Sequence, residues 1–194
     1  MVLFVFGPSH VGKTFFASRL TNHCGISSLS IDLLKMGLIR SGIVSLTPED
    51  DDALVDVLWP IVREMVQTAL ENNQNLIVEG DYLPTDWRIS FSKEADVMAI
   101  GLAMTEAHLR DHYDEIIQHR HAIEIRHHEA PTFEELVQAH THTRTQCMSG
   151  YSQLVLIDGD YQYAINRALE FAIHLFEKDH KYMNLPQEMP TLKE

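Results

Sequence analysis

Short apolar runs alternate along this chain with longer segments in which apolar residues recur every three or four positions. The short runs predict strands, because continuous apolar stretches of about four to eight residues are typical of strands buried in a parallel sheet. The predicted strands lie at residues 2–6, 27–31, 75–78, 96–103 and 153–157.

The periodic segments between the strands predict amphipathic helices. The longest covers residues 53–70, about five turns, with Thr47 and Pro48 expected as its N-cap and first helical residue. Thr132 and Glu135 have the spacing of a capping box, so another helix is expected to begin there. Further helices are predicted after Gly12 and at residues 33–40, 105–128 and 161–176.

The order of these elements indicates the fold class. Strands that alternate with helices favour an α/β protein built on a five-stranded parallel sheet with helices on both faces. No internal repeat, low-complexity run or linker-like segment divides the chain. We therefore expect a single domain over residues 1–194.

A glycine-containing loop follows the first strand directly. Its sequence, GPSHVGKT, matches the pattern G-x-x-x-x-G-K-[ST] of a phosphate-binding loop, which lies between a strand and a helix. Gly7 and Gly12 allow a tight turn close to an anion, and the loop N–H groups at the helix N-terminus bind phosphate. Lys13 is expected to reach the β- and γ-phosphates, and the Thr14 hydroxyl is expected to bind Mg²⁺. The predicted nucleotide site is thus Gly7, Pro8, Ser9, His10, Val11, Gly12, Lys13 and Thr14.

The composition narrows the classes of partner. With 28 acidic and 15 basic residues the formal net charge is −13, which argues against nucleic acid or an anionic membrane as a partner. Cys24 and Cys147 show neither metal-binding spacing nor a disulfide framework, so a reducing cytoplasm is expected. No apolar stretch has the length of a signal sequence or of a membrane span.

Two further segments, SIDLLKMGLIR and LIVEGDYLP, carry a family resemblance together with the loop. The chain resembles the P-loop small-molecule kinases of the adenylate kinase-like superfamily, in particular 2-phosphoglycerate kinase and adenylate kinase-type bacterial proteins. The resemblance implies a phosphate loop on the central strand, a substrate-side helical segment at about residues 33–72 and a helical lid at about 105–147. It also places the adenine edge at Asp158 and Gly159, and the missing N-K-x-D motif of GTPases favours ATP.

The chain departs from adenylate kinase itself in two segments. The stretch EGDYLP at residues 79–84 stands where that enzyme has Asp-Gly-Phe-Pro-Arg, and the lid arginines are widely spaced. These arginines are Arg110, Arg120, Arg126 and Arg144, of which Arg110 and Arg126 are predicted to stabilise transition-state charge. AMP is therefore not the favoured acceptor.

Phosphoryl transfer also needs an oriented nucleophile, and acidic residues follow two of the predicted strands. Asp32 is predicted to orient or deprotonate an acceptor hydroxyl; the alternative is that it caps the helix beginning at Leu33. Glu79 is predicted to act on Mg²⁺ through water; the alternative is a structural hydrogen bond. An anionic acceptor would be held by Lys35, Arg40 and Arg88, each of which is alternatively a surface charge.

Eight of the twelve histidines lie between His108 and His142. His108 and His112 are one helical turn apart, which suits a metal site, but the remaining histidines fit no consistent ligand geometry. The favoured interpretation is a solvated lid face.

The sequence thus predicts transfer of the γ-phosphoryl group from ATP and Mg²⁺ to a small-molecule hydroxyl or phosphate acceptor. Two alternatives remain: a nucleoside monophosphate kinase, and an ATP-binding regulatory protein that is not a kinase.

Overall fold

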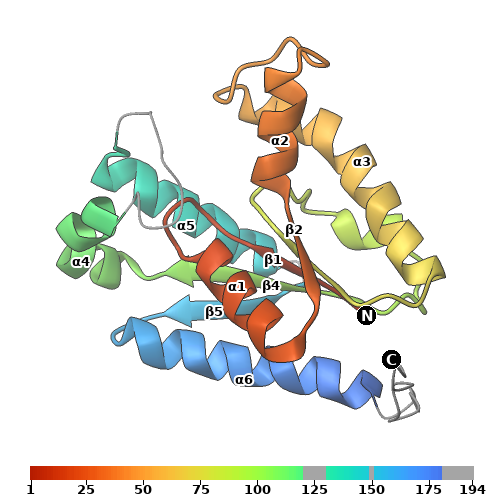
Figure 1. Cartoon of the computed structure of the whole chain (residues 1–194). Coiled ribbons are helices and arrows are strands. Elements are labelled where there is room, and N and C mark those ends of the chain that lie inside the picture. The colour runs from red at the N-terminus through yellow and green to blue at the C-terminus, as the bar shows by residue number, and fades with distance from the viewer. Residues whose placement is uncertain (120–129, 149–150, 181–194) are drawn as a thin grey trace, which may run out of the picture.

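The computed structural model describes residues 1–119, 130–148 and 151–180, the last three as backbone only. Its centre is a five-stranded, entirely parallel sheet in the order β2-β3-β1-β4-β5 (Figure 1). The strands are β1 (Val2–Phe6), β2 (Ser27–Ser30), β3 (Leu76–Glu79), β4 (Val97–Met104) and β5 (Gln153–Ile157). Because β1 is the middle strand, the loop that follows it leaves the sheet at its centre.

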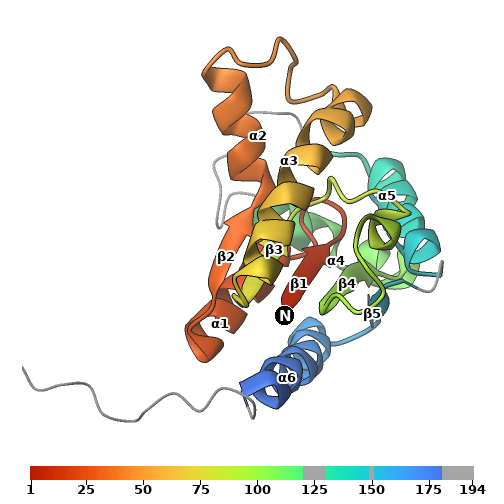
Figure 2. The same cartoon turned by 90° about the vertical axis from the view of Figure 1, so that its right-hand side faces the viewer.

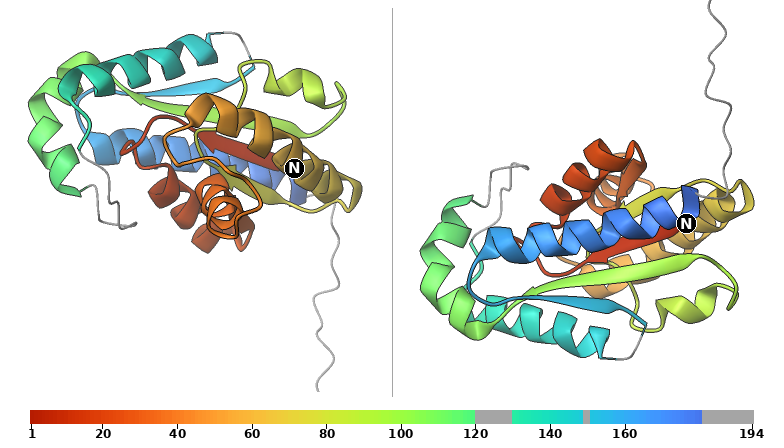
Figure 3. Two further views of the ribbon diagram at one scale, coloured as in Figure 1. Left: turned by 90° about the horizontal axis from the view of Figure 1, so that it is seen from above. Right: turned by 90° about the horizontal axis from the view of Figure 1, so that it is seen from below.

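Helices cover both faces of the sheet, as predicted. Figures 1 and 3 show α1 and α6 side by side on one face and α3 and α5 on the other. The helices are α1 (Lys13–Cys24), α2 (Ile31–Arg40), α3 (Asp51–Glu71), α4 (Glu106–Gln118), α5 (Phe133–Cys147) and α6 (Tyr161–His180), with a 3₁₀ turn η1 (Trp87–Ser90). None of these described helices combines the length and the apolar content that crossing a bilayer requires.

The alternation of side chains along β1 divides the core into two layers. Leu3 and Val5 pack with α1 and α6, whereas Val2, Phe4 and Phe6 pack with α3. All five side chains are fully buried, which explains the continuous apolar run in the sequence.

The start of α3 corrects one prediction. Thr47 and Pro48 precede the helix, which begins at Asp51 with Asp50 as its N-cap residue. The amide and hydroxyl of Thr47 donate to the Asp50 carboxylate at 2.7 and 2.9 Å, so these residues form a turn that leads into the helix. The capping box of α5 is present as predicted, with Thr132 and Glu135 bonded reciprocally.

The carboxyl ends of the strands lie between α2 and α3 on one side and α4 on the other. Figure 2 shows α2 and α3 rising above the sheet on the side away from α6. In Figure 1, α4 lies beyond the carboxyl ends of β4 and β5. Ligands of parallel α/β sheets bind at this end of the strands.

Candidate functional site

The loop between β1 and α1 has the backbone that its two glycines predict. Gly7 and Gly12 have φ angles of 143° and 95°, which residues with a Cβ rarely adopt. A Cβ on Gly7 would lie 2.3 Å from the Leu102 carbonyl oxygen, and one on Gly12 would lie 2.0 Å from the Tyr161 hydroxyl. Both conformation and space therefore require glycine at these positions.

The Lys13 side chain folds back over this loop. Its ammonium donates to the carbonyl oxygens of Gly7 at 2.6 Å and Pro8 at 3.0 Å, and the residue is only 7% exposed. The loop carbonyls thus hold the ammonium of the first residue of α1 against the loop. A cation and a helix N-terminus at one place favour the binding of phosphate.

Thr14 and Glu79 meet beside the loop although they are 65 residues apart. The Thr14 hydroxyl donates to Glu79 Oε2 at 3.2 Å, while Glu79 Oε1 is buried without a hydrogen-bond partner. Burial raises the pKa of Glu79, and the Asp32 charge adds to this, whereas Ser30, Lys13 and Thr14 oppose it.

This pair of oxygen ligands fits Mg²⁺. Mg²⁺ sites in kinases use one or two protein oxygens, and substrate phosphates and water complete the octahedron. A hydroxyl and a carboxylate oxygen that lacks a partner meet this need. Within the described residues no three His, Cys, Asp or Glu side chains form a metal site of their own.

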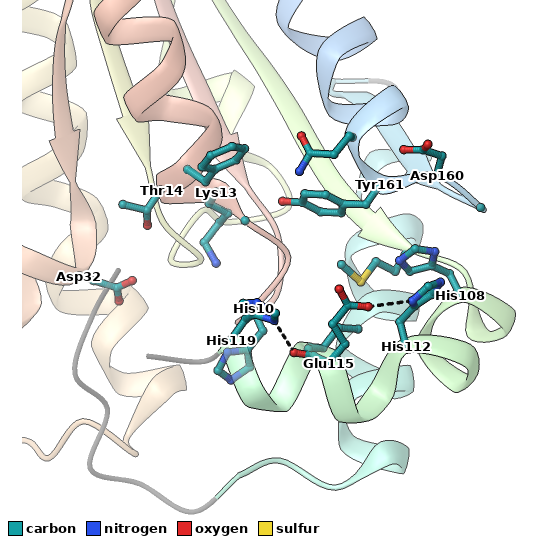
Figure 4. A pocket seen from close by; sticks show the side chains of 16 residues that line it. His10, Lys13, Thr14, Asp32, His108, His112, Glu115, His119, Asp160 and Tyr161 are labelled. Atoms are coloured by element: carbon teal, nitrogen blue, oxygen red, sulfur yellow. Dashed lines mark hydrogen bonds and ion pairs between the residues drawn. The ribbon is translucent and has the colours of Figure 1, made fainter. Parts of the chain in front are cut away.

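A cavity of about 880 Å³ opens in front of the loop (Figure 4). It is bounded by the phosphate loop, the start of α2, one face of α4 and the start of α6. Of the predicted site residues, those lining it are His10, Gly12, Lys13, Thr14, Asp32 and Gly159.

Histidines of α4 form the cavity wall opposite the loop. His108, His112 and His119 line it together with Glu115, at intervals that place all four on one face of the helix. The His108 and His112 rings lie 4.5 Å apart, and His108 is 6% exposed. Burial lowers the pKa of His108, and the neighbouring His112 lowers it further. The expected solvated histidine face is therefore wrong for His108, which lies with Leu109 on the buried side of α4.

Tyr161, at the start of α6, lies on the other side of the cavity. Its hydroxyl donates to the Val11 carbonyl at 3.3 Å, so it covers the loop at Gly12. No motif in the sequence pointed to Tyr161, although it lies two positions after the predicted adenine edge. At that edge Gly159 lines the cavity, whereas the Asp158 carboxylate accepts a hydrogen bond from the Thr105 hydroxyl at 3.0 Å.

The burial of His140 on α5 was also not predicted from the sequence. The residue is 2% exposed, and its Nδ1 accepts the Met104 amide N–H at 2.9 Å, so Nε2 carries the proton of the neutral ring. Burial lowers its pKa to about 4, and the charges of Lys13, His108 and His10 add to this effect. The signal in the sequence was the helical spacing that places His140 on the same face as Leu136 and Thr143, both buried.

A polar network runs from Asp32, which lines the cavity, through Lys35 and Tyr82 to α3. The Asp32 carboxylate lies 3.5 Å from the Lys35 ammonium, which donates to the Tyr82 hydroxyl at 2.6 Å. That hydroxyl donates to Asp51 at 3.0 Å. Asp32 is not the helix cap, because α2 begins at Ile31 and its N-cap residue is Ser30. The capping alternative for Asp32 is therefore wrong.

Four predicted arginines within the described residues do not line this cavity. Arg88 donates to four backbone carbonyls of the loop that follows η1 and so holds that loop together. Arg110 pairs with Glu106 and lies over the Phe133 ring, and Arg40 is exposed in the last turn of α2. Arg144 is exposed on α5, and Arg120 and Arg126 lie outside the described residues.

Solved structures of small-molecule kinases share this fold. A gluconokinase from Sinorhizobium meliloti 1021 superposes with a TM-score of 0.54 at 16% identity, over 93% of this chain and 95% of its own. A sugar kinase from Janibacter sp. HTCC2649 gives 0.51 at 18% identity, over 90% and 96% of the two chains. A shikimate kinase from Bacteroides thetaiotaomicron gives 0.51 at 12% identity, over 89% and 98%. No family model and no curated protein matches the chain. The chain therefore has the fold of the P-loop small-molecule kinases, as its resemblance to them predicted.

Proposed function

We propose that this protein transfers the γ-phosphoryl group of ATP to a hydroxyl group of a small-molecule acceptor. The observation that carries the proposal is the convergence on one cavity of three functions. Lys13 supplies a cation on a phosphate loop, the Thr14–Glu79 pair offers oxygen ligands, and Asp32 offers a carboxylate. The kinase titles of the structural neighbours support the same class of reaction.

Each group has a defined part in this reaction. Lys13 and the loop N–H groups bind the β- and γ-phosphates and stabilise the charge that develops on them. Thr14 and Glu79 would hold Mg²⁺, which when bound neutralises phosphate charge. The base of the nucleotide would lie between the α4 histidines and the segment from Gly159 to Tyr161, which line facing walls of the cavity.

Asp32 orients the acceptor and takes its proton. The acceptor oxygen bonds to the γ-phosphorus, the bond from that phosphorus to the bridging oxygen breaks, and ADP leaves with the bonding electrons. The hydroxyl proton passes to the Asp32 carboxylate, which points into the cavity in Figure 4. The products are ADP and the phosphorylated acceptor.

One domain over residues 1–194 would contain both sides of the cavity. Residues 33–72 form the acceptor side, and residues 105–147 form a lid that excludes water when nucleotide is bound. We place the reaction in the cytoplasm, where ATP and Mg²⁺ are plentiful. The free thiols of Cys24 and Cys147 are compatible with a reducing compartment.

Lys13→Ala tests the proposal. The substitution should lower acceptor-dependent ADP release by about 10²–10³-fold, because it removes the cation that stabilises the transferred phosphoryl group. Lys93→Ala, which removes an exposed lysine, is the matched control and should retain the parent rate. Calorimetric titration with MgATP and a coupled ADP assay over a panel of hydroxyl compounds provide the measurements. Equal rates in the Lys13→Ala and parent proteins would overturn the proposal.

A further inference from the structure

Two buried side-chain oxygens at the ends of β2 and β3 have no hydrogen-bond partner within the part of the chain that the structure describes. They are Ser30 Oγ and Glu79 Oε1, and Glu79 is 2% exposed. Buried polar atoms without a partner are rare in folded proteins, and each of them calls for an explanation. The positions of these two residues give them a common one.

Ser30 and Glu79 are the last residues of adjacent parallel strands. β2 ends at Ser30, β3 ends at Glu79, and the two residues are paired in register. Paired residues of neighbouring strands direct their side chains to the same face of a sheet. The Ser30 hydroxyl also lowers the pKa of Glu79, in agreement with this placement. The hydroxyl and the carboxylate therefore lie together at the end of the sheet where ligands bind.

The hydroxyl of Ser30 is not used to cap a helix. Ser30 is the N-cap residue of α2, a position where a serine side chain commonly accepts a hydrogen bond from an amide of the first turn. Thr105 and Thr132, the N-cap residues of α4 and α5, both accept such a bond. The Ser30 side chain makes none. Its hydroxyl is therefore available as a donor to Glu79.

The other carboxylate oxygen of Glu79 is already bonded. Oε2 accepts a hydrogen bond from the Thr14 hydroxyl at 3.2 Å. In the proposed function, on which this inference rests, Thr14 and Glu79 hold Mg²⁺. A carboxylate that is bonded through one oxygen alone is incompletely oriented, and hydrogen bonds from outside the ligand set strongly affect how tightly a metal is bound. A donor at Oε1 would complete the orientation of Glu79.

We infer that Ser30 is a positioning residue of the Mg²⁺ site. When the metal is bound, the Ser30 hydroxyl donates to Glu79 Oε1 and so holds Oε2 at the Thr14 hydroxyl. Ser30 immediately precedes α2, whose first turn carries Asp32. Figure 4 shows Thr14 and Asp32 on the same side of Lys13. The end of β2 thus supports both the metal site and the carboxylate proposed to act on the acceptor.

Titration of the ADP-bound protein with Mn²⁺ tests this role. Mn²⁺ takes the same oxygen ligands as Mg²⁺, and EPR measures the free ion directly. Ser30→Ala should weaken Mn²⁺ binding about tenfold or more, as the loss of a partner that orients a metal ligand commonly does. Its affinity for ADP in EDTA, measured by calorimetry, should equal that of the parent, because the phosphate loop is unchanged. Ser28→Ala, which removes an exposed hydroxyl from the same strand, is the matched control and should bind Mn²⁺ as the parent does.

A double substitution shows whether Ser30 acts through Glu79. In a Glu79→Gln background, Ser30→Ala should have no further effect on Mn²⁺ binding, because the carboxylate that it orients is absent. If Glu79→Gln binds too little Mn²⁺ to measure, Ser30→Thr decides, because it keeps the hydroxyl and should bind Mn²⁺ more tightly than Ser30→Ala.

Three results would overturn the inference: parent-like Mn²⁺ affinity in Ser30→Ala, equal losses in the two backgrounds, or no recovery in Ser30→Thr. A Ser30→Ala protein that is less stable but binds Mn²⁺ like the parent falls under the first of these, since the hydroxyl would then be structural only. If the ADP complex of the parent binds no Mn²⁺, the proposed function fails instead. The two failures are therefore distinguishable.

Discussion

Replacing His140 with glutamine should make the protein less sensitive to acid. The imidazole is 2% exposed and accepts the Met104 amide through Nδ1, an arrangement that only the neutral ring can provide. Its pKa is about 4 in the folded protein, against an ordinary value of 6.5. Below pH 6.5 the unfolded chain therefore binds a proton that the folded protein does not, and the free energy of unfolding falls.

The two pKa values determine the size of this effect. Through this one side chain the free energy of unfolding should fall by about 2 kcal/mol between pH 7 and pH 5, and by about 3 kcal/mol once the pH is below 4. His108, whose pKa is also lowered by burial, acts in the same direction but is present in both proteins. The difference between the parent and the His140→Gln curves therefore isolates the contribution of His140.

Urea unfolding at pH 7, 6 and 5 provides the measurement. His140→Gln will be less stable than the parent at pH 7, since the fit to the Met104 amide is lost, but the gap should narrow by about 2 kcal/mol at pH 5. His174→Gln, which removes an exposed imidazole from α6, is the matched control for the loss of one histidine. Parallel curves for the parent and His140→Gln would refute the reasoning.

Two further substitutions test the loop and the proposed base. Gly12→Ala should destabilise the protein by about 1–3 kcal/mol and weaken MgATP binding, since the new Cβ would meet the Tyr161 hydroxyl. Tyr161→Phe in that background should restore part of the stability in thermal unfolding; additive losses would exclude this clash as the cause. Asp32→Asn should lower acceptor-dependent turnover by about 10²–10⁴-fold while calorimetry shows little change in ATP affinity. Asp32 lies in the first turn of α2 and is not its cap. The free energy of unfolding of the Asp32→Asn protein should therefore be less than about 1 kcal/mol below that of the parent. Turnover at the parent rate would remove Asp32 from the proposed mechanism.

The elements that are formed by residues close together in the sequence were predicted correctly. The fifth strand lies at Gln153–Ile157 and the first at Val2–Phe6, as their apolar runs indicated, and the α5 capping box forms between residues three positions apart. The phosphate loop belongs to the same group, because its glycines must adopt positive φ angles between a strand and a helix. Such features require only local backbone geometry, so the local sequence determines them.

The chemical environment of the site was decided by the tertiary structure. His140 is buried by its contact with Met104, 36 residues earlier, and Tyr161 covers a loop 150 residues away. Arg88 has the charge to bind an anion, but the path of the loop after η1 brings four carbonyls to it first. Periodicity shows which residues share a helix face, but the packing of distant elements decides whether that face meets solvent, core or cavity. The sequence therefore determined the fold and the phosphate loop, whereas the packing of α2, α4, α5 and α6 around the strand ends decided which charges face the cavity.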